Sequence, residues 1–363
     1  MSSETNMNDL EDSKHLREDK ILKNWLNKSF IALIAAMALS ILFTITLVNA
    51  ILEFPHVLNT LLIETYPDYG DMWLDPSLQV IEELKPLGFL CFALVIIGII
   101  IGFLTKRVKI AFLSSVTIYL PIFGYFAVSM FAFAGIGILR VIWLPLFGSS
   151  IVPWEILTLG DIVLLPFSIS IYVIQLFLTE FLEVSVTREL LFDFKVGIGL
   201  LCLRLGFVIF LFSSFNWLYA KFSRVEIIDF WLYKYSRHPQ YVGLLLASYG
   251  MLIHINFLPY ARGGYIPAPS LLWLIMALLI VSISLKEELT LFQEQPEEYH
   301  AFRQKAPFLF PLPMRISDLF LFPAQKFLKK DWPESNKDIF ILMSFYGVIL
   351  IVSSLIYLPN LLA

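Results

Sequence analysis

The stretch from Ser236 to Leu289 reads SRHPQYVGLLLASYGMLIHINFLPYARGGYIPAPSLLWLIMALLIVSISLKEEL. It contains two apolar runs, with the polar cluster SRHPQYVG before the first run and KEEL after the second. Because two consecutive membrane spans joined by a short turn form a helical hairpin, we expect both clusters at the same membrane face. Arg, His, Tyr and Glu gathered where a bilayer meets water are costly to hold in place and indicate a functional site.

The composition of the whole chain is that of a membrane protein. Of 363 residues, 58% are hydrophobic and 15% are charged, far from the averages for soluble domains. The net charge of -4 is small, and no basic footprint for nucleic acid is visible. Cys91 and Cys202 both lie inside apolar runs, which predicts packing roles, and no zinc or iron ligand spacing is present, so we expect no metal site.

The apolar stretches predict an all-α, polytopic integral membrane protein with about eight to nine transmembrane helices, including the hairpin in the C-terminal half. A span needs about 20 apolar residues. Such stretches lie near 29–52, 87–105, 110–134, 136–152, 158–181, 195–218, 240–258, 270–286 and 338–361. The weakest is 136–152, and 158–181 carries Asp161 and Pro166 at what we expect to be its cytosolic end.

Basic residues near the ends of the spans predict the orientation, because cytosolic loops are enriched in Lys and Arg. The polar tail 1–28 precedes the first span, and basic residues also precede the spans at 240–258 and 338–361. We therefore expect a multi-pass protein whose N-terminus and polar clusters face the cytosol. The acidic segment 53–86 and the turn 259–269 fall on the opposite side.

The polar clusters themselves suggest local structure. Pro239 suits the first turn of a helix, so we expect the first span of the hairpin to begin there, with Arg237 and His238 at the mouth of a pocket. Gly243 lies one turn inside, where a missing side chain lets either another helix or a flat ligand approach the backbone. Both interpretations of Gly243 remain open from the sequence.

The carboxylates after the second span also allow two interpretations. Glu287 and Glu288 emerge directly from the span opposite Arg237 and His238. They predict either an ion pair that closes the hairpin or a carboxylate that binds a cationic cofactor or its ribose hydroxyls. The residues that follow, up to Phe310, alternate apolar and charged side chains and predict an amphipathic segment on the membrane surface.

Four elements in this order produce a family resemblance. Arg-His-Pro-x-Tyr-x-Gly, a helical hairpin, Glu-Glu-x-x-Leu, and Glu-Tyr-x-x-Phe ahead of a proline resemble the isoprenylcysteine carboxyl methyltransferase family and its phospholipid methyltransferase relatives. Related membrane sterol and enone reductases share a weaker version of the pattern. The resemblance covers about 195–312, leaving 29–190 as a membrane region without an assigned role and 313–363 as a linker and final helix.

The resemblance implies an S-adenosylmethionine-dependent methyltransferase with a cytosol-facing pocket and a lipidic or prenylated acceptor that enters from the bilayer. Methyl transfer from a sulfonium needs alignment and exclusion of water more than strong acid–base catalysis. The residues that the resemblance assigns to the cofactor are Tyr233, His238, Pro239, Gln240, Tyr241, Gly243 and Glu287. Arg237 and Glu288 are the expected catalytic residues. Arg204, inside a span, is a candidate for contacting a substrate headgroup or for pairing with Asp161.

The chain departs from the family pattern at three positions. Trp231 stands where the family often has a glycine two residues before Tyr233, and Pro296 replaces another frequent glycine and should end the preceding helix. Ile283 stands where the eukaryotic enzymes carry the arginine that engages the acceptor carboxylate. The acceptor group, whether carboxylate, amine, hydroxyl or thiol, is therefore open, as is the oligomeric state.

Two other classes of function fit the same residues. A basic mouth at Arg237 and His238 could hold the phosphate of NADPH in a membrane reductase of a sterol-like or enone lipid. A non-enzymatic membrane receptor or scaffold could keep the same fold. Cofactor binding discriminates among the three classes.

Overall fold

The computed structural model describes residues 29–49, 158–257, 270–312 and 332–361, together with a few isolated positions between 156 and 330. Within these ranges the protein is helical and has no strand. Four of the described helices are long and apolar enough to cross a membrane. The predicted tail 1–28, the spans at 87–105, 110–134 and 136–152, and the loops at 53–86 and 259–269 lie outside the described residues.

Helix boundaries follow from local sequence. The elements are a helix at Ser29–Asn49, η2 (Asp161–Leu164), α5 (Leu165–Glu180), α6 (Arg188–Phe222), η3 (Trp231–Lys234), α7 (Pro239–Phe257), α8 (Ser270–Glu294), α9 (Pro296–Lys305) and α11 (Asn336–Leu361). The side chain of Thr187 caps α6 by accepting a hydrogen bond from the backbone N–H of Leu190. Pro239 begins α7, and Pro296 separates α8 from α9, as the sequence predicts.

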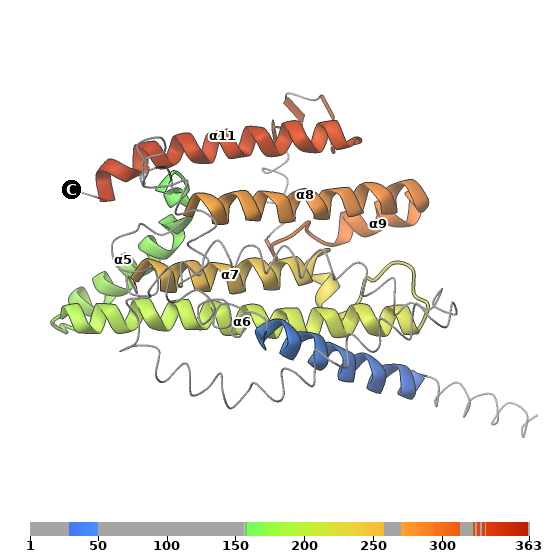
Figure 1. The fold of residues 1–363 in the computed structure, drawn as a ribbon, viewed down its shortest axis with the longest axis horizontal. Coiled ribbons are helices and arrows are strands. Elements are labelled where there is room, and N and C mark those ends of the chain that lie inside the picture. Colours follow the sequence, from blue (N-terminus) through green and yellow to red (C-terminus); the bar gives the residue numbers. More distant parts are fainter. Residues whose placement is uncertain are drawn as a thin grey trace, which may run out of the picture.

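Helices α6, α7, α8 and α11 run alongside one another in that order (Figure 1). Trp273 of α8 donates a hydrogen bond of 3.1 Å from Nε1 to Ser248 Oγ of α7. On the other side of α8, Leu285 packs against Ile339 and Leu342 of α11. The helix Ser29–Asn49 packs against α6 through a cluster formed by Ala36, Phe43 and Leu218. The region resembling the methyltransferases is therefore enclosed by helices that the resemblance does not cover.

The contact between α6 and α7 is built from glycines, which form what we call the glycine seam: Gly199 and Gly206 on α6, Gly243 and Gly250 on α7. A Cβ built on Gly206 would lie 2.3 Å from the backbone nitrogen of Ala247, and one on Gly243 would lie 2.7 Å from that of Phe210. The two helices therefore approach closely enough that backbone atoms touch, as small residues allow in membrane helices. This decides between the two interpretations of Gly243: it serves helix packing.

The contacts of η2 show which end of α8 lies beside the start of the predicted span at 158–181. Asp161 accepts a hydrogen bond from the Ser270 hydroxyl at the first residue of α8, and a Cβ on Gly160 would collide with the Ser270 backbone. Ser270 is separated from Glu287 by most of the 25-residue α8. Asp161 therefore lies at the opposite end of the helices from Arg237, because η2 packs against the start of α8. The sequence predicts both residues at the cytosolic end, and the two placements cannot both hold.

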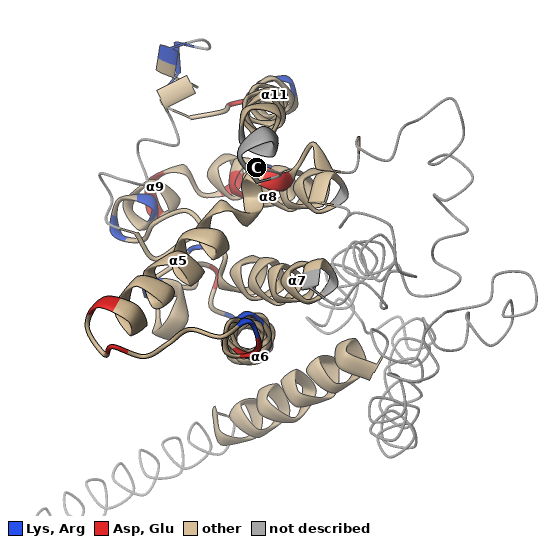
Figure 2. Cartoon of the chain, turned by 90° about the vertical axis from the view of Figure 1, so that its left-hand side faces the viewer, with Lys and Arg blue, Asp and Glu red and all other residues tan. Residues whose placement is uncertain are grey.

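Helix α8 continues beyond the predicted end of its span. It remains helical to Glu294, so Glu287 and Glu288 lie within the helix instead of in a segment after it. The short helix α9 follows and buries Tyr299 and Phe302 against Tyr233 and Ala220. These two apolar side chains of α9 thus pack on protein, whereas Phe292 and Phe310 of the same predicted amphipathic segment are exposed. In Figure 2, which views the helices end-on, acidic residues colour part of α8 and basic residues colour part of α9.

Candidate functional site

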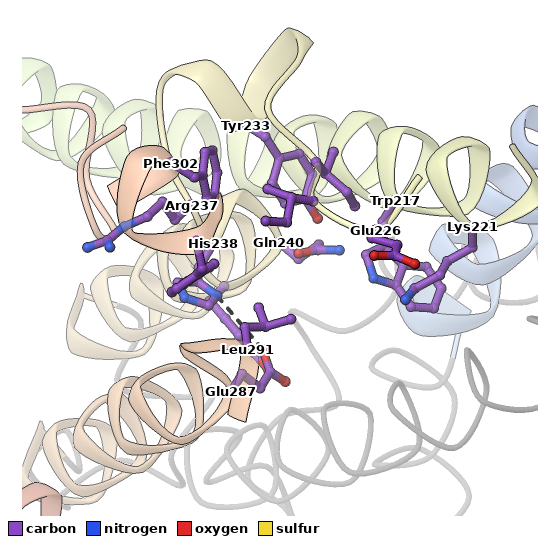
Figure 3. A pocket seen from close by; sticks show the side chains of 14 residues that line it. Trp217, Lys221, Glu226, Tyr233, Arg237, His238, Gln240, Glu287, Leu291 and Phe302 are labelled. Carbon is purple, nitrogen blue, oxygen red and sulfur yellow. Dashed lines mark hydrogen bonds and ion pairs between the residues drawn. The ribbon is translucent and has the colours of Figure 1, made fainter. Parts of the chain in front are cut away.

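A pocket lies where the N-terminus of α7, the C-terminal part of α8, α9 and the end of α6 meet (Figure 3). Its cavity volume is about 120 Å³, and the cavity is open to solvent on one side. This volume is below the usual range for small-molecule sites, about 300–1,000 Å³. The lining residues are Trp217, Lys221, Glu226, Ile227, Ile228, Tyr233, Arg237, His238, Gln240, Tyr241, Glu287, Leu291, Tyr299 and Phe302.

Glu288 is the anion of a buried ion-pair cluster behind the pocket. Its Oε1 lies 3.2 Å from Nε of Arg237 and 3.2 Å from Nε2 of His238. The side chain of Glu288 is fully buried, and that of Arg237 is 4% exposed. Burying charges is costly unless they compensate one another, so this cluster joins α8 to the start of α7. For Glu288, the predicted interpretation as a structural ion pair therefore fits the geometry.

Arg237 is enclosed by aromatic rings on the side away from the pocket. Its guanidinium carbon lies 5.6 Å from the ring centroid of Phe308 and 5.1 Å from that of Trp332. Arg303 of α9 stacks on the same Trp332 ring at 4.1 Å. The backbone N–H of Arg237 also donates a 3.0 Å hydrogen bond to the carbonyl of Pro307. Arg237 is thus held inside the protein and does not lie at the mouth predicted for it.

Glu287 differs from its neighbour because it faces the pocket. Its side chain is 39% exposed, its Oε1 accepts a 2.5 Å hydrogen bond from the Tyr241 hydroxyl, and its Oε2 lies 3.8 Å from Nδ1 of His238. The residue lies one position beyond the apolar run of α8. Burial in the surrounding protein raises the pKa of the Glu287 carboxyl, while His238 and the Tyr241 hydroxyl offset part of the increase.

The α9 wall carries two further titratable groups close to Glu288. Burial raises the pKa of the Tyr299 hydroxyl, and the charge of Glu288 raises it further. Burial lowers the pKa of the Arg303 guanidinium, and the negative charge of Glu288 offsets part of this decrease. Tyr299 therefore stays protonated at neutral pH, and its hydroxyl donates a hydrogen bond toward the buried Glu288.

The predicted cofactor residues divide into two groups. Tyr233, His238, Gln240, Tyr241 and Glu287 line the pocket together. Pro239 is buried at the start of α7 and Gly243 faces α6, so the described geometry places neither against the pocket. The reason is helical periodicity, which directs positions 240 and 241 into the cavity and position 243 into the glycine seam.

Arg204 lies away from these residues. Its side chain is exposed on α6, and the lining of the pocket does not include it among the described residues. Asp161, its predicted alternative partner, accepts its hydrogen bond from Ser270. The structure therefore gives no geometric support for Arg204 as a headgroup contact in this pocket.

Trp231, which stands at a position where the family often has a glycine, adopts a backbone conformation that favours glycine. It adopts φ 50°, in the left-handed region that favours glycine and strains other residues. Its ring stacks on Phe215 at 5.3 Å and meets Phe230 edge-on at 5.2 Å. These ring contacts hold the residue in a conformation that its own side chain disfavours, so the turn that leads to Tyr233 keeps its shape without glycine.

Sequence reasoning missed the wall of the pocket opposite Glu287. Trp217 and Lys221 come from the end of α6, and Glu226 comes from the segment that follows it. The only signal in the sequence was the spacing of Trp217 and Lys221, which are four positions apart and so share a helix face. Trp332, which covers Arg237, was also missed because it lies far along the chain from every recognised motif.

Comparisons with known proteins identify no relative: no protein-family description, no curated protein and no solved structure matches this chain.

Proposed function

We propose that this protein is an S-adenosylmethionine-dependent methyltransferase that acts at the membrane–cytosol interface on a lipidic or isoprenoid acceptor, in the manner of the isoprenylcysteine carboxyl methyltransferases. The observation that carries the proposal is the charge of the pocket. Arg237 is compensated by Glu288 behind the wall, which leaves Glu226 and Glu287 against Lys221 around the cavity. A formally acidic, aromatic-lined pocket favours a cationic ligand over a phosphate.

The residues around the cavity suit that cofactor. Glu287, positioned by Tyr241 and His238, offers a partly exposed carboxylate to ribose hydroxyls or to the positive charge of the sulfonium. The rings of Trp217, Tyr233 and Phe302 supply apolar walls that exclude water. When bound, the cofactor supplies a methyl group whose bond to sulfur breaks as the acceptor's lone pair forms the new bond. The protein's contribution is to align the two molecules.

In this proposal Arg237 and Glu288 are positioning residues. Glu288 holds the imidazole of His238 through Nε2, so Nδ1 is directed toward Glu287. The expected direct catalytic role of Arg237 and Glu288 is replaced by this indirect one, since both side chains are nearly inaccessible. Because the buried pair fixes both sides of the pocket, its loss would disturb cofactor binding without removing a ligand contact.

The proposed orientation places the pocket on the cytosolic side of a multi-pass protein. Lys221, Arg224 and Lys234 lie near the pocket, at the end of α6 and the start of α7, and positive residues favour the cytosol. Leu291, Ile227 and Ile228 give the cavity an apolar part that suits a lipid tail. The full count of eight to nine spans, with α7 and α8 as a hairpin, belongs to this proposal.

Calorimetry on the detergent-purified protein tests the function. We expect the wild type to bind S-adenosylmethionine, Glu287→Gln and His238→Ala to lose binding, and Glu294→Gln, an exposed change on the same helix, to bind normally. The reason is that Glu287 and His238 line the cavity, whereas Glu294 does not. Equal affinities for all four proteins would defeat the assignment of the site.

A second experiment separates the three classes of function. Native membranes incubated with labelled S-adenosylmethionine should yield a labelled lipid only when the protein is present and Glu287 intact. Binding of NADPH in place of S-adenosylmethionine would favour the reductase. Failure to bind either cofactor, with full activity of Glu287→Gln in cells, would favour a receptor or scaffold.

A further inference from the structure

The wall of the pocket opposite Glu287 carries one positive and one negative side chain, and the two come from different segments of the chain. Lys221 belongs to the last turn of α6, and Glu226 follows in the segment between α6 and η3. Figure 3 shows both side chains beside Trp217, across the cavity from His238 and Glu287. No motif of the family resemblance includes these residues.

Each charge is held in place by a neutral neighbour. Nζ of Lys221 lies 5.7 Å from the ring centroid of Trp217, one helical turn earlier. A carboxylate oxygen of Glu226 accepts a hydrogen bond from the side-chain amide of Gln295, which lies between α8 and α9. Among the described residues, no carboxylate lies within ion-pair distance of Lys221. The ammonium and the carboxylate therefore both remain available to a molecule in the cavity.

From this arrangement we infer that Lys221 and Glu226 recognise a zwitterionic amino-acid group at the end of the ligand away from Glu287. The α-carboxylate of the ligand would pair with Lys221 and its α-ammonium with Glu226, while Trp217 covers the connecting chain. This inference rests on the proposed function, because the methionyl part of S-adenosylmethionine is such a group. It adds which end of the cavity holds that part, and therefore which end holds the ribose.

The distribution of charge supports one orientation of the ligand. A carboxylate placed beside Glu287 would meet like charge, whereas at Lys221 it meets the cation of the pocket that no described carboxylate compensates. A ligand with phosphates would face both Glu226 and Glu287. A simple amine would leave Lys221 without an anion. Only a ligand with an anion and a cation close together at one end satisfies both side chains of this wall.

Decarboxylated S-adenosylmethionine isolates this contact, because it keeps the sulfonium and the amine but lacks the carboxylate. Calorimetry on the full-length protein in detergent should show about tenfold tighter binding of S-adenosylmethionine than of the decarboxylated form, the size expected for one charge-assisted hydrogen bond. Lys221→Met should lower affinity for S-adenosylmethionine about tenfold and leave the decarboxylated form unaffected. Lys221→Arg should restore most of the preference.

Lys234→Met is the matched control, since this exposed lysine lies on η3 and does not line the cavity. Glu226→Gln should weaken both ligands, because both carry the ammonium. Equal affinity of the wild-type protein for the two ligands overturns the inference without any variant, and the proposed function survives it. Absence of binding of either ligand by the wild type overturns the proposed function and this inference together.

Discussion

Helix α7 is held in two different ways. Along α6 it packs through the glycine seam, where backbone touches backbone, whereas at its N-terminus Arg237 and His238 are bound to Glu288 of α8 by buried charge. At Gly206, Gly243 and Gly250 the seam leaves no room for a Cβ, because each would lie within 3.0 Å of backbone atoms of the facing helix. The charged end fills its space with long side chains and depends on their compensation. The glycines therefore determine how closely α6 and α7 pack, whereas the buried charges determine the shape of the pocket.

The largest expected effect is on the seam. Gly206→Val places atoms inside the backbone of α7, because even a Cβ there lies 2.3 Å from the nitrogen of Ala247. We expect no folded, monodisperse protein in detergent. Gly197→Ala is the matched control on the same helix, since a Cβ there meets nothing within 4 Å. Size-exclusion chromatography distinguishes the two, and a folded Gly206→Val protein would mean that the seam can open.

The second largest loss of stability is expected when the Glu288 carboxylate is removed. Glu288→Ala leaves Arg237 buried without its anion, a change that typically costs about 3–5 kcal/mol. Thermal unfolding in detergent should show a large decrease in midpoint, and Glu294→Ala, which removes an exposed carboxylate from the same helix, should leave it unchanged. If both variants unfold at the same midpoint, the buried carboxylate of Glu288 contributes no more to stability than the exposed carboxylate of Glu294.

Trp332 tests how the charged end is covered. Trp332→Leu removes the ring between Arg237 and Arg303 and should destabilise the protein by about 1–2 kcal/mol. The double variant Trp332→Leu with Arg303→Met should lose less than the sum of the two single changes, because both act through one contact. Strict additivity in unfolding measurements would show that the stacking carries no energy.

Variants of Trp231 test how much strain the backbone holds at this turn. Replacement by Ala removes the aromatic contacts but keeps a Cβ at φ 50°, whereas replacement by Gly removes the contacts and the strain. We expect Trp231→Gly to be about 1 kcal/mol more stable than Trp231→Ala in unfolding experiments. An alanine variant as stable as the glycine variant would rule out strain at this turn.

The smallest effect concerns the response of the charged end to pH. Because burial raises the pKa of Glu287 in the folded protein, the folded state binds a proton more readily than the unfolded chain. Stability should therefore decrease as pH rises through the range between the ordinary and the raised pKa, and Glu287→Gln should remove that slope. Unfolding midpoints at a series of pH values measure it; an unchanged slope would assign the titration to another group.

The sequence predicted the parts of the site that depend on short-range order. Pro239 marked the start of α7, Pro296 the break after α8, and the order of the two apolar runs predicted that His238 and the glutamates would meet. It could not decide whether Gly243 faces a ligand or a helix, because that depends on which neighbour occupies the adjoining face. The sequence did not predict that Lys221 and Glu226 line the pocket, because a charged residue near the end of a span ordinarily indicates only the orientation of that span.

The longer-range errors have a common origin. The place of Asp161 relative to Arg237 was inferred from the number of spans and the basic residues near their ends, but η2 is held by Ser270 and by a hydrogen bond from Tyr249 to the Val163 carbonyl. The extent of α8 was inferred from hydrophobicity, but its C-terminal part is bound by Arg237 and His238, which directly precede α7. Both depend on tertiary contacts that local periodicity does not encode.

Trp332 also bears on how the protein is made. It contacts Arg237 although it lies beyond both pocket-forming helices in the sequence. During synthesis, α7 and α8 leave the ribosome before the ring that covers the arginine between them exists. The buried guanidinium therefore receives this neighbour only after residue 332 has been synthesised. A chain terminated before that point would carry every pocket motif and still leave this side of Arg237 without the Trp332 ring.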